Sequence, residues 1–141
     1  MIQPKPLRHA IVAIIEDGDQ ILMIERAKQD SFPGYWSAVT GGVEKDETPA
    51  DACIRECMEE VGLLVRPVQK VWESMTRRMP FVLHWWRCEL IGSNIINPDP
   101  TEVGGYRWVK IDRAHLMPLM FSDSRFFYRE IYPRVALKEL A

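Results

Sequence analysis

The chain has 141 residues, of which 47% are hydrophobic and 27% charged, a balance typical of one folded domain spanning residues 1–141. Its formal net charge of −2 argues against binding to duplex nucleic acid, because that role needs a broad basic surface. The apolar runs are too short to cross a bilayer and the N-terminus lacks a signal-like segment. We therefore expect a cytoplasmic protein with reduced cysteines and no membrane partner.

The first third of the chain contains segments rich in β-branched residues, which indicate strands. Residues His9–Ile15 and Gln20–Arg26 flank an Asp-Gly-Asp turn sequence, and this order predicts a β-hairpin. After a break at Phe32-Pro33-Gly34, residues Tyr35–Val39 predict a short strand. A loop that begins with Gly41-Gly42 is expected to follow this strand directly.

Residues 48–62 carry the start and stop signals of a helix. Thr48 offers a capping hydroxyl, Pro49 suits the first helical position, and Gly62 is the expected C-terminal stop. Apolar side chains recur at helical spacing and should pack on the sheet, whereas three glutamates should point the other way. The apolar set is Ile54, Cys57, Met58 and Val61, and the acidic set is Glu56, Glu59 and Glu60.

The second half of the chain predicts three further strands and one terminal helix. The strands are Val65–Met75, Phe81–Ile91 and Tyr106–Ile111, with a loop rich in Gly, Asn, Pro and Asp from Gly92 to Gly105. Ser122 could cap a helix that runs to Tyr132, where Pro133 would stop or kink it. Strands interrupted by one internal helix and followed by another predict an α/β (α+β) sandwich around a mixed sheet.

The acidic helix face is the first chemical clue. Three glutamates within about one helical turn repel one another, but exposed glutamates are common on solvated helices, and alone this set favours a solvated face. Two neighbouring features change that interpretation. Gly41-Gly42 allows backbone to approach a ligand, and an ion pair between Glu47 and Arg55 would tie the loop to the helix. An oxygen-rich pocket of this kind suits Mg²⁺, with Mn²⁺ as an alternative.

The spacing of these residues resembles the signature of the Nudix hydrolase family of MutT-like pyrophosphohydrolases. That signature is G-x5-E-x7-R-E-U-x-E-E-x-G-U, where U is a bulky aliphatic residue. Gly41, Glu47 and the run from Arg55 to Leu63 match it, and Cys57 at the first U position is the one departure. We expect Cys57 to be buried as a small hydrophobic residue. The resemblance implies a Nudix-type α/β/α sandwich with a C-terminal helix.

The resemblance also implies roles for individual residues. Glu56, Glu59 and Glu60 would be the metal-binding and catalytic acids, Gly41 would offer a backbone ligand, and Glu47 and Arg55 would support the site. Glu102 precedes Trp108 in a late loop, where family members often place a further carboxylate that binds metal or acts as the general base. A loop glutamate is equally often an ordinary solvated residue, so both interpretations stay open. The implied reaction is attack by water on a diphosphate bridge of a nucleoside-diphosphate-type substrate.

The identity of the substrate stays open at this point. The segment Trp36–Gly41 resembles dihydroneopterin and deoxynucleoside triphosphate pyrophosphatases within the family, which favours a nucleoside or pterin triphosphate. The alternatives are an ADP-ribose or nucleotide-sugar pyrophosphatase, an RNA end-processing enzyme, and a non-catalytic nucleotide sensor. A homodimer is possible with any of these functions. The residues that could contact a base or phosphate, each with a purely structural alternative, are Arg26, Lys28, Arg77, Arg78, Trp85, Trp86 and Arg87. The histidines His9, His84 and His115 are isolated in the sequence and receive no role.

Overall fold

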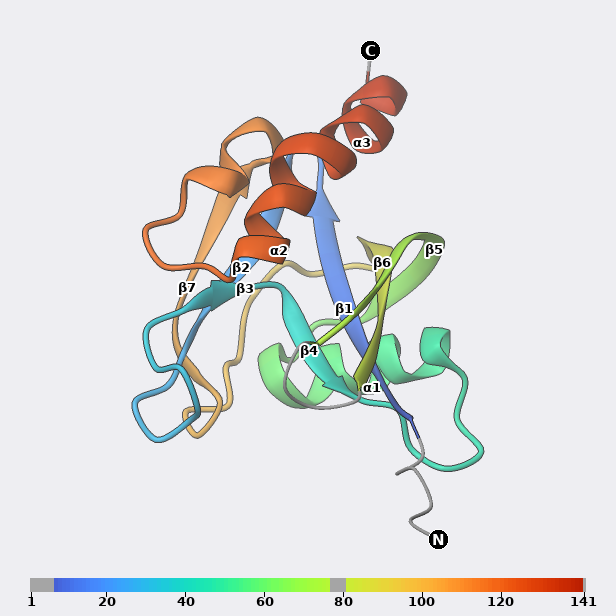
Figure 1. The fold of residues 1–141 in the computed structure, drawn as a ribbon, viewed down its shortest axis with the longest axis vertical. Coiled ribbons are helices and arrows are strands. Elements are labelled where there is room, and N and C mark those ends of the chain that lie inside the picture. Colours follow the sequence, from blue (N-terminus) through green and yellow to red (C-terminus); the bar gives the residue numbers. More distant parts are fainter. Residues whose placement is uncertain (1–6, 77–80, 141) are drawn as a thin grey trace, which may run out of the picture.

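Seven strands form one mixed β-sheet in the computed structural model, which describes residues 7–76 and 81–140 (Figure 1). Strands β1 and β6 are parallel, and all other described strand pairs are antiparallel. The strands are β1 (Arg8–Asp17), β2 (Gln20–Arg26), β3 (Trp36–Ser37), β4 (Val39–Gly42), β5 (Val65–Met75), β6 (Phe81–Leu90) and β7 (Val103–Lys110). The predicted mixed sheet is confirmed.

The β1–β2 hairpin separates soon after its turn. The register pairs Glu16 with Ile21 and Asp17 with Gln20, after which β2 continues beside β3 and β7 while β1 continues beside β4 and β6. The chain changes partner at Ala38, so the single strand predicted over Tyr35–Val39 is two short strands. Gly41 and Gly42 end β4 and do not lie in a loop, because both pair with β1. Sequence patterns do not reveal the change of partner at Ala38, since the residues before and after it both have the pattern of an extended strand.

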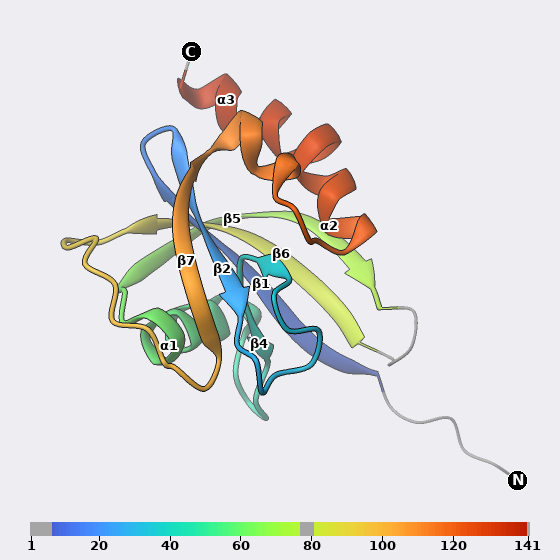
Figure 2. The ribbon, with the colours of Figure 1, turned by 90° about the vertical axis from the view of Figure 1, so that its left-hand side faces the viewer.

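Helices cover both faces of the sheet (Figure 2). Helix α1 (Pro49–Val61) packs on one face over an apolar cluster that includes Ile11, Ile15 and Cys57. On the other face lie a 3₁₀ segment (Ile111–Leu116) and the C-terminal helical run, over a cluster that includes Phe127 and Tyr128. Cys53, Cys57 and Cys88 are all buried with free thiols, as expected of packing residues. No helix within the described ranges is both long and apolar enough to span a bilayer.

The caps of α1 are those that its sequence predicts. The Thr48 hydroxyl accepts a hydrogen bond of 3.1 Å from the backbone N–H of Asp51, Pro49 opens the helix, and Gly62 ends it with φ of 69°. The buried face of α1 differs from the predicted one, however. Met58 is 47% exposed, whereas Glu60 is 6% exposed and lies on the buried side with Cys53 and Cys57. A carboxylate on that side needs a polar neighbour or a cation, which hydrophobic spacing alone does not reveal.

The C-terminal third differs from its predicted bounds in three ways. Strand β7 begins at Val103, three residues before Tyr106, because Val103 and Gly105 pair with Arg26 and Glu25 at the end of β2. The residue that caps the last helix is Phe121, and Ser122 makes no side-chain cap. The helix also passes Pro133: α2 (Ser122–Phe126) leads through a π-helical turn (Phe127–Ile131) into α3 (Tyr132–Leu140). Pro133 thus falls in the first turn of a new α-helical segment, where proline is tolerated.

Replacing Gly62 with alanine should lower the free energy of unfolding by about 1–2 kcal/mol, because a Cβ at this left-handed position is strained. The Cβ would also lie 3.0 Å from Cβ of Asn97, in the loop that packs on the helix end. Gly18→Ala is the matched control, since Gly18 has φ of 62° with open space around it. Chemical denaturation should show a larger loss for Gly62→Ala. Equal losses would mean that the Asn97 contact contributes nothing.

Candidate active site

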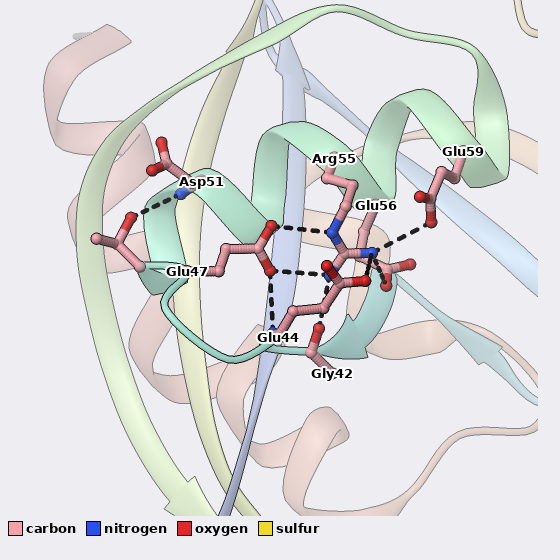
Figure 3. Close-up of polar contacts among 8 residues, drawn as sticks. Gly42, Glu44, Glu47, Asp51, Arg55, Glu56 and Glu59 are labelled. Atoms are coloured by element: carbon pink, nitrogen blue, oxygen red, sulfur yellow. Dashed lines mark hydrogen bonds and ion pairs between the residues drawn. The ribbon is translucent and has the colours of Figure 1, made fainter.

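Arg55 makes the most side-chain contacts at the site, and its guanidinium joins helix α1 to the preceding loop and to β4 (Figure 3). It donates two hydrogen bonds to the Glu47 carboxylate, at 2.9 and 3.0 Å, and one of 2.8 Å to the carbonyl oxygen of Gly42. It also donates to Glu56 at 2.9 Å and to Glu59 at 3.2 Å. Hydrogen bonding to Arg55 lowers the pKa of Glu47. One cation therefore orients carboxylates from two segments.

Gly41 makes the closest approach between the sheet and the acidic helix. A Cβ at this position would lie 2.1 Å from Cδ of Glu56, so no other residue fits without displacing that carboxylate. Burial raises the pKa of Glu56, and Arg55 opposes the shift. The requirement for glycine in the motif is thus steric: it lets the Glu56 carboxylate lie directly against the strand.

Glu60 is the most buried acid of the set. Burial, with the nearby negative charges of Glu56 and Glu102, raises the pKa of Glu60 to about 9. Its Oε2 atom is buried and has no hydrogen-bond partner, while its carboxyl group shares a hydrogen bond with Glu56. Arg26 is the positive group that acts in the opposite direction. Such a carboxyl group is matched to a cation that would satisfy the free oxygen.

The loop that carries Glu102 is fastened to the C-terminal end of α1. The backbone N–H groups of Asn97 and Asp99 donate to the carbonyl oxygens of Val61 and Glu60, at 2.9 and 2.8 Å. The Glu102 carbonyl in turn accepts a 3.2 Å hydrogen bond from Ala27, just beyond β2. These bonds hold an exposed Glu102 within electrostatic range of Glu60. The structure therefore brings Glu102 near the acidic cluster. The sequence alone did not decide whether this loop glutamate lies near the cluster or elsewhere.

The acids fit a hard divalent cation by their chemistry, although they are engaged differently here. Within residues 7–76 and 81–140, no three His, Cys, Asp or Glu side chains converge in an arrangement ready to hold a metal ion. Arg55 explains this, because its guanidinium occupies the oxygens of Glu56 and Glu59. The unpartnered oxygen of Glu60 and the close Gly41 backbone leave an all-oxygen donor set, which suits Mg²⁺ or Mn²⁺.

A cavity of about 660 Å³ adjoins this cluster on the side of the C-terminal helix. Gly41, Gly42 and Arg26 line it near the acids, and apolar residues that include Leu83 and Trp85 line it beyond them. Asp123 and Arg26 are the charged residues among its lining, counted over the described part of the chain. A volume of this size matches small-molecule sites.

The structure separates the residues whose roles the sequence left open. Arg26 and Trp85 line the cavity, and the C-terminal helix packs against Trp85. Trp86 packs on the α1 side, and Arg87 is buried in a bidentate ion pair with Glu16. Lys28 is exposed and lies outside the cavity lining, and Arg77 and Arg78 lie outside the described residues. The ring nitrogens of His9 and His84 lie 2.9 Å apart, so these two histidines, isolated in the sequence, are in contact in the fold.

Sequence reasoning missed Phe32, which it treated as part of a break. Phe32 lines the cavity, is 46% exposed as a residue, and has a backbone φ of 54°. A bulky residue in this left-handed region costs about 1–2 kcal/mol. The segment reads as a turn from its Pro-Gly pair, and no local pattern shows that its aromatic ring meets residues near position 121.

Fold and sequence similarity together identify a hydrolase that acts on phosphoanhydride bonds. The chain belongs to the Nudix family: residues 5–134 match the NUDIX domain. Its Nudix-type fold of helices on both faces of a mixed sheet is shared by the MutT protein of Methanosarcina mazei Go1. That structure superposes with a TM-score of 0.76 at 19% identity, over 98% of this chain and 99% of the other.

Two curated relatives act on RNA, according to their names. An RNA pyrophosphohydrolase of Pseudomonas fluorescens (strain SBW25) is 33% identical, with all of this chain and 96% of the relative covered. An NAD-capped RNA hydrolase, NudC, of Stutzerimonas stutzeri (strain A1501) is 29% identical over 89% of this chain. The chain spans 44% of the length of that second relative.

Proposed function

We propose that this protein is a Mg²⁺-dependent pyrophosphohydrolase, with Mn²⁺ as an alternative ion, whose substrate is a (deoxy)nucleoside or pterin triphosphate. One observation carries the proposal: a cavity of about 660 Å³ is lined by Gly41, Gly42 and Arg26 and also by apolar side chains that include Leu83 and Trp85. A triphosphate with a planar ring combines an anionic part, which Arg26 would contact, with a ring that the apolar side chains would cover. Gly41 also lies directly against Glu56 of the acidic cluster.

The proposed roles follow the positions of the side chains. Glu56, Glu59 and Glu60 would hold the metal with the carbonyl of Gly41, while Glu47 and Arg55 support them. The bound ion would supply charge neutralisation of the phosphate oxygens and a lowered pKa for water. Arg26 would contact a substrate phosphate, because its Nε atom is buried without a hydrogen-bond partner and its guanidinium lines the cavity. Glu102 stays a candidate ligand or general base.

The proposed reaction needs no covalent intermediate. Water adds to one phosphorus of the bridge, the P–O bond to the leaving pyrophosphate breaks, and a carboxylate accepts the proton that water releases. The acids of α1 are the candidates for that carboxylate. Most of the rate enhancement would come from fixed positions and charges, since phosphoryl groups spread their charge over several oxygens.

An RNA 5′-triphosphate is the second candidate substrate. The similarity to an RNA pyrophosphohydrolase over nearly the full length of both chains favours it. Against it, Arg26 is the single cation among the cavity-lining residues in the described part of the chain. An RNA chain beyond its first nucleotide would need more positive charge to neutralise its backbone. A cytoplasmic location and a homodimer stay predictions.

Glu59→Gln should lower the rate on the best substrate by at least about tenfold, because the variant loses one charged ligand. The measurement is pyrophosphate or phosphate release with Mg²⁺ from a panel: nucleoside and pterin triphosphates, ADP-ribose, nucleotide sugars, RNA 5′-triphosphate and NAD-capped RNA. Glu130→Gln is the matched control, since this glutamate lies on the C-terminal helical run outside the cavity lining.

Each outcome of the panel has a definite meaning. Highest turnover of a free triphosphate supports the proposal, and highest turnover of RNA 5′-triphosphate supports the second candidate in its place. Native turnover by Glu59→Gln would contradict the assignment of the metal site. Tight binding of one compound without hydrolysis would support the nucleotide sensor instead.

A further inference from the structure

Phe32 occupies an unusual position in the lining of the cavity. Its ring makes edge contacts with Phe121 and Tyr35, at centroid distances of 4.9 and 5.5 Å, and yet the residue stays 46% exposed. Its φ of 54° lies in the region where glycine or asparagine is at home. An aromatic residue thus stands in a strained backbone position and displays apolar surface to solvent, two features that packing alone does not explain.

The turn around Phe32 is firmly held. The guanidinium of Arg26 donates to the carbonyl oxygen of Ser31 at 3.3 Å and pairs with Asp30 at 3.8 Å. Within the turn, the N–H of Tyr35 donates to the Phe32 carbonyl oxygen at 3.2 Å. Arg26 also lies over the Phe121 ring, 5.8 Å from its centroid. Arg26, which lines the cavity, therefore holds the backbone next to Phe32 and lies over the Phe121 ring that Phe32 contacts.

We propose that Phe32 is a specificity-determining residue whose exposed ring stacks on the planar heteroaromatic ring of the substrate. This inference rests on the proposed function. Phe32 would favour a triphosphate that carries a ring over a phosphate chain without one. Gly41 and Gly42 line the same cavity as Phe32, and its apolar lining includes Met75 and Leu83. A ring held among them would cover the exposed apolar surface of Phe32. Stacking tolerates any flat base, because every base has a π face.

The two reaction products separate the ring from the phosphates. A nucleoside monophosphate carries the ring and pyrophosphate does not, so their inhibition constants report on different ends of the cavity. Phe32→Ala should raise the inhibition constant of the monophosphate of the best substrate about tenfold. The inhibition constant of pyrophosphate should stay within about twofold, since no phosphate contact is removed.

Three further variants make the test specific. Phe32→Gly removes the ring and also relieves the backbone strain, and it should weaken monophosphate inhibition as Phe32→Ala does. Phe32→Tyr retains the ring and should leave both constants near native values. Leu116→Ala is the matched surface control, because Leu116 is 60% exposed on the 3₁₀ segment and does not line the cavity.

Equal monophosphate inhibition of the native protein and both ring-less variants would overturn the role of Phe32. A parallel loss of pyrophosphate inhibition would also overturn it, because the ring would then act by positioning the whole turn. Failure of the proposed function looks different: the native protein would hydrolyse no ring-bearing triphosphate at all. If an RNA 5′-triphosphate proves the best substrate, the same experiment applies to its 5′-monophosphate product.

Discussion

Arg55→Lys is expected to lower kcat/KM by at least about tenfold and the free energy of unfolding by about 2 kcal/mol. Arginine presents a planar set of donors that meets Glu47 in a bidentate pair and simultaneously reaches Gly42, Glu56 and Glu59. Lysine keeps the charge but offers one compact ammonium group, which cannot span these acceptors. Steady-state kinetics and chemical denaturation measure the two effects.

Arg66→Lys serves as the control for Arg55→Lys. Arg66 pairs with Glu89 on β5 and β6, where both side chains are largely exposed, and exposed pairs contribute little to stability. This substitution should change neither activity nor stability measurably. Native kcat/KM in Arg55→Lys would mean that charge alone, without the fixed geometry, suffices at the site.

Glu60→Gln is expected to reduce kcat/KM by at least about 100-fold while leaving the metal-free protein as stable as before, or more stable. Glu60 is 6% exposed, near Glu56 and Glu102, and one of its oxygens lacks a hydrogen-bond partner. The raised pKa keeps Glu60 largely protonated at neutral pH when no cation is bound, so a neutral amide should cost the metal-free protein little stability. The amide cannot ionise, however, so the proposed cation would lose a charged ligand.

The thermal midpoint measured with and without Mg²⁺ separates these effects. The native protein should gain stability when Mg²⁺ is added, because an ion that binds the folded state shifts the equilibrium towards it. Glu60→Gln should lose most of that gain, and Glu60→Asp, which keeps the charge, should retain part of it. A full Mg²⁺ response in Glu60→Gln would show that Glu60 is not a ligand.

Arg55 also holds several carboxylates close to one another at the start of the acidic helix face. Arg55 takes up oxygens of Glu56 and Glu59 that the proposed metal would otherwise engage. Its contacts with Glu47 and Gly42 hold the loop and the strand end in place at the same time. These contacts therefore fix the backbone segments from which the proposed metal ligands extend.

Much of the site could be predicted because it is local in sequence. Thr48, Pro49 and Gly62 bound the helix through contacts within a few residues, and the spacing from Gly41 to Leu63 indicates the family. The mixed sheet follows from the strand patterns, and the helices on both of its faces follow from the family resemblance. The bounds of β7, the partner exchange at Ala38 and the passage through Pro133 could not be predicted, because each depends on pairing or packing with distant segments.

The amino-acid order by itself determined the acidic helix, its caps and the glycine beside it, since these depend on interactions over one or two turns of chain. Tertiary structure alone decided that Glu60 faces inward, that Glu102 lies near it, and that Phe32 borders a cavity with Phe121. The physical reason is distance along the chain. Burial and electrostatic environment come from neighbours brought together by folding, and a local pattern contains no record of which neighbours those are.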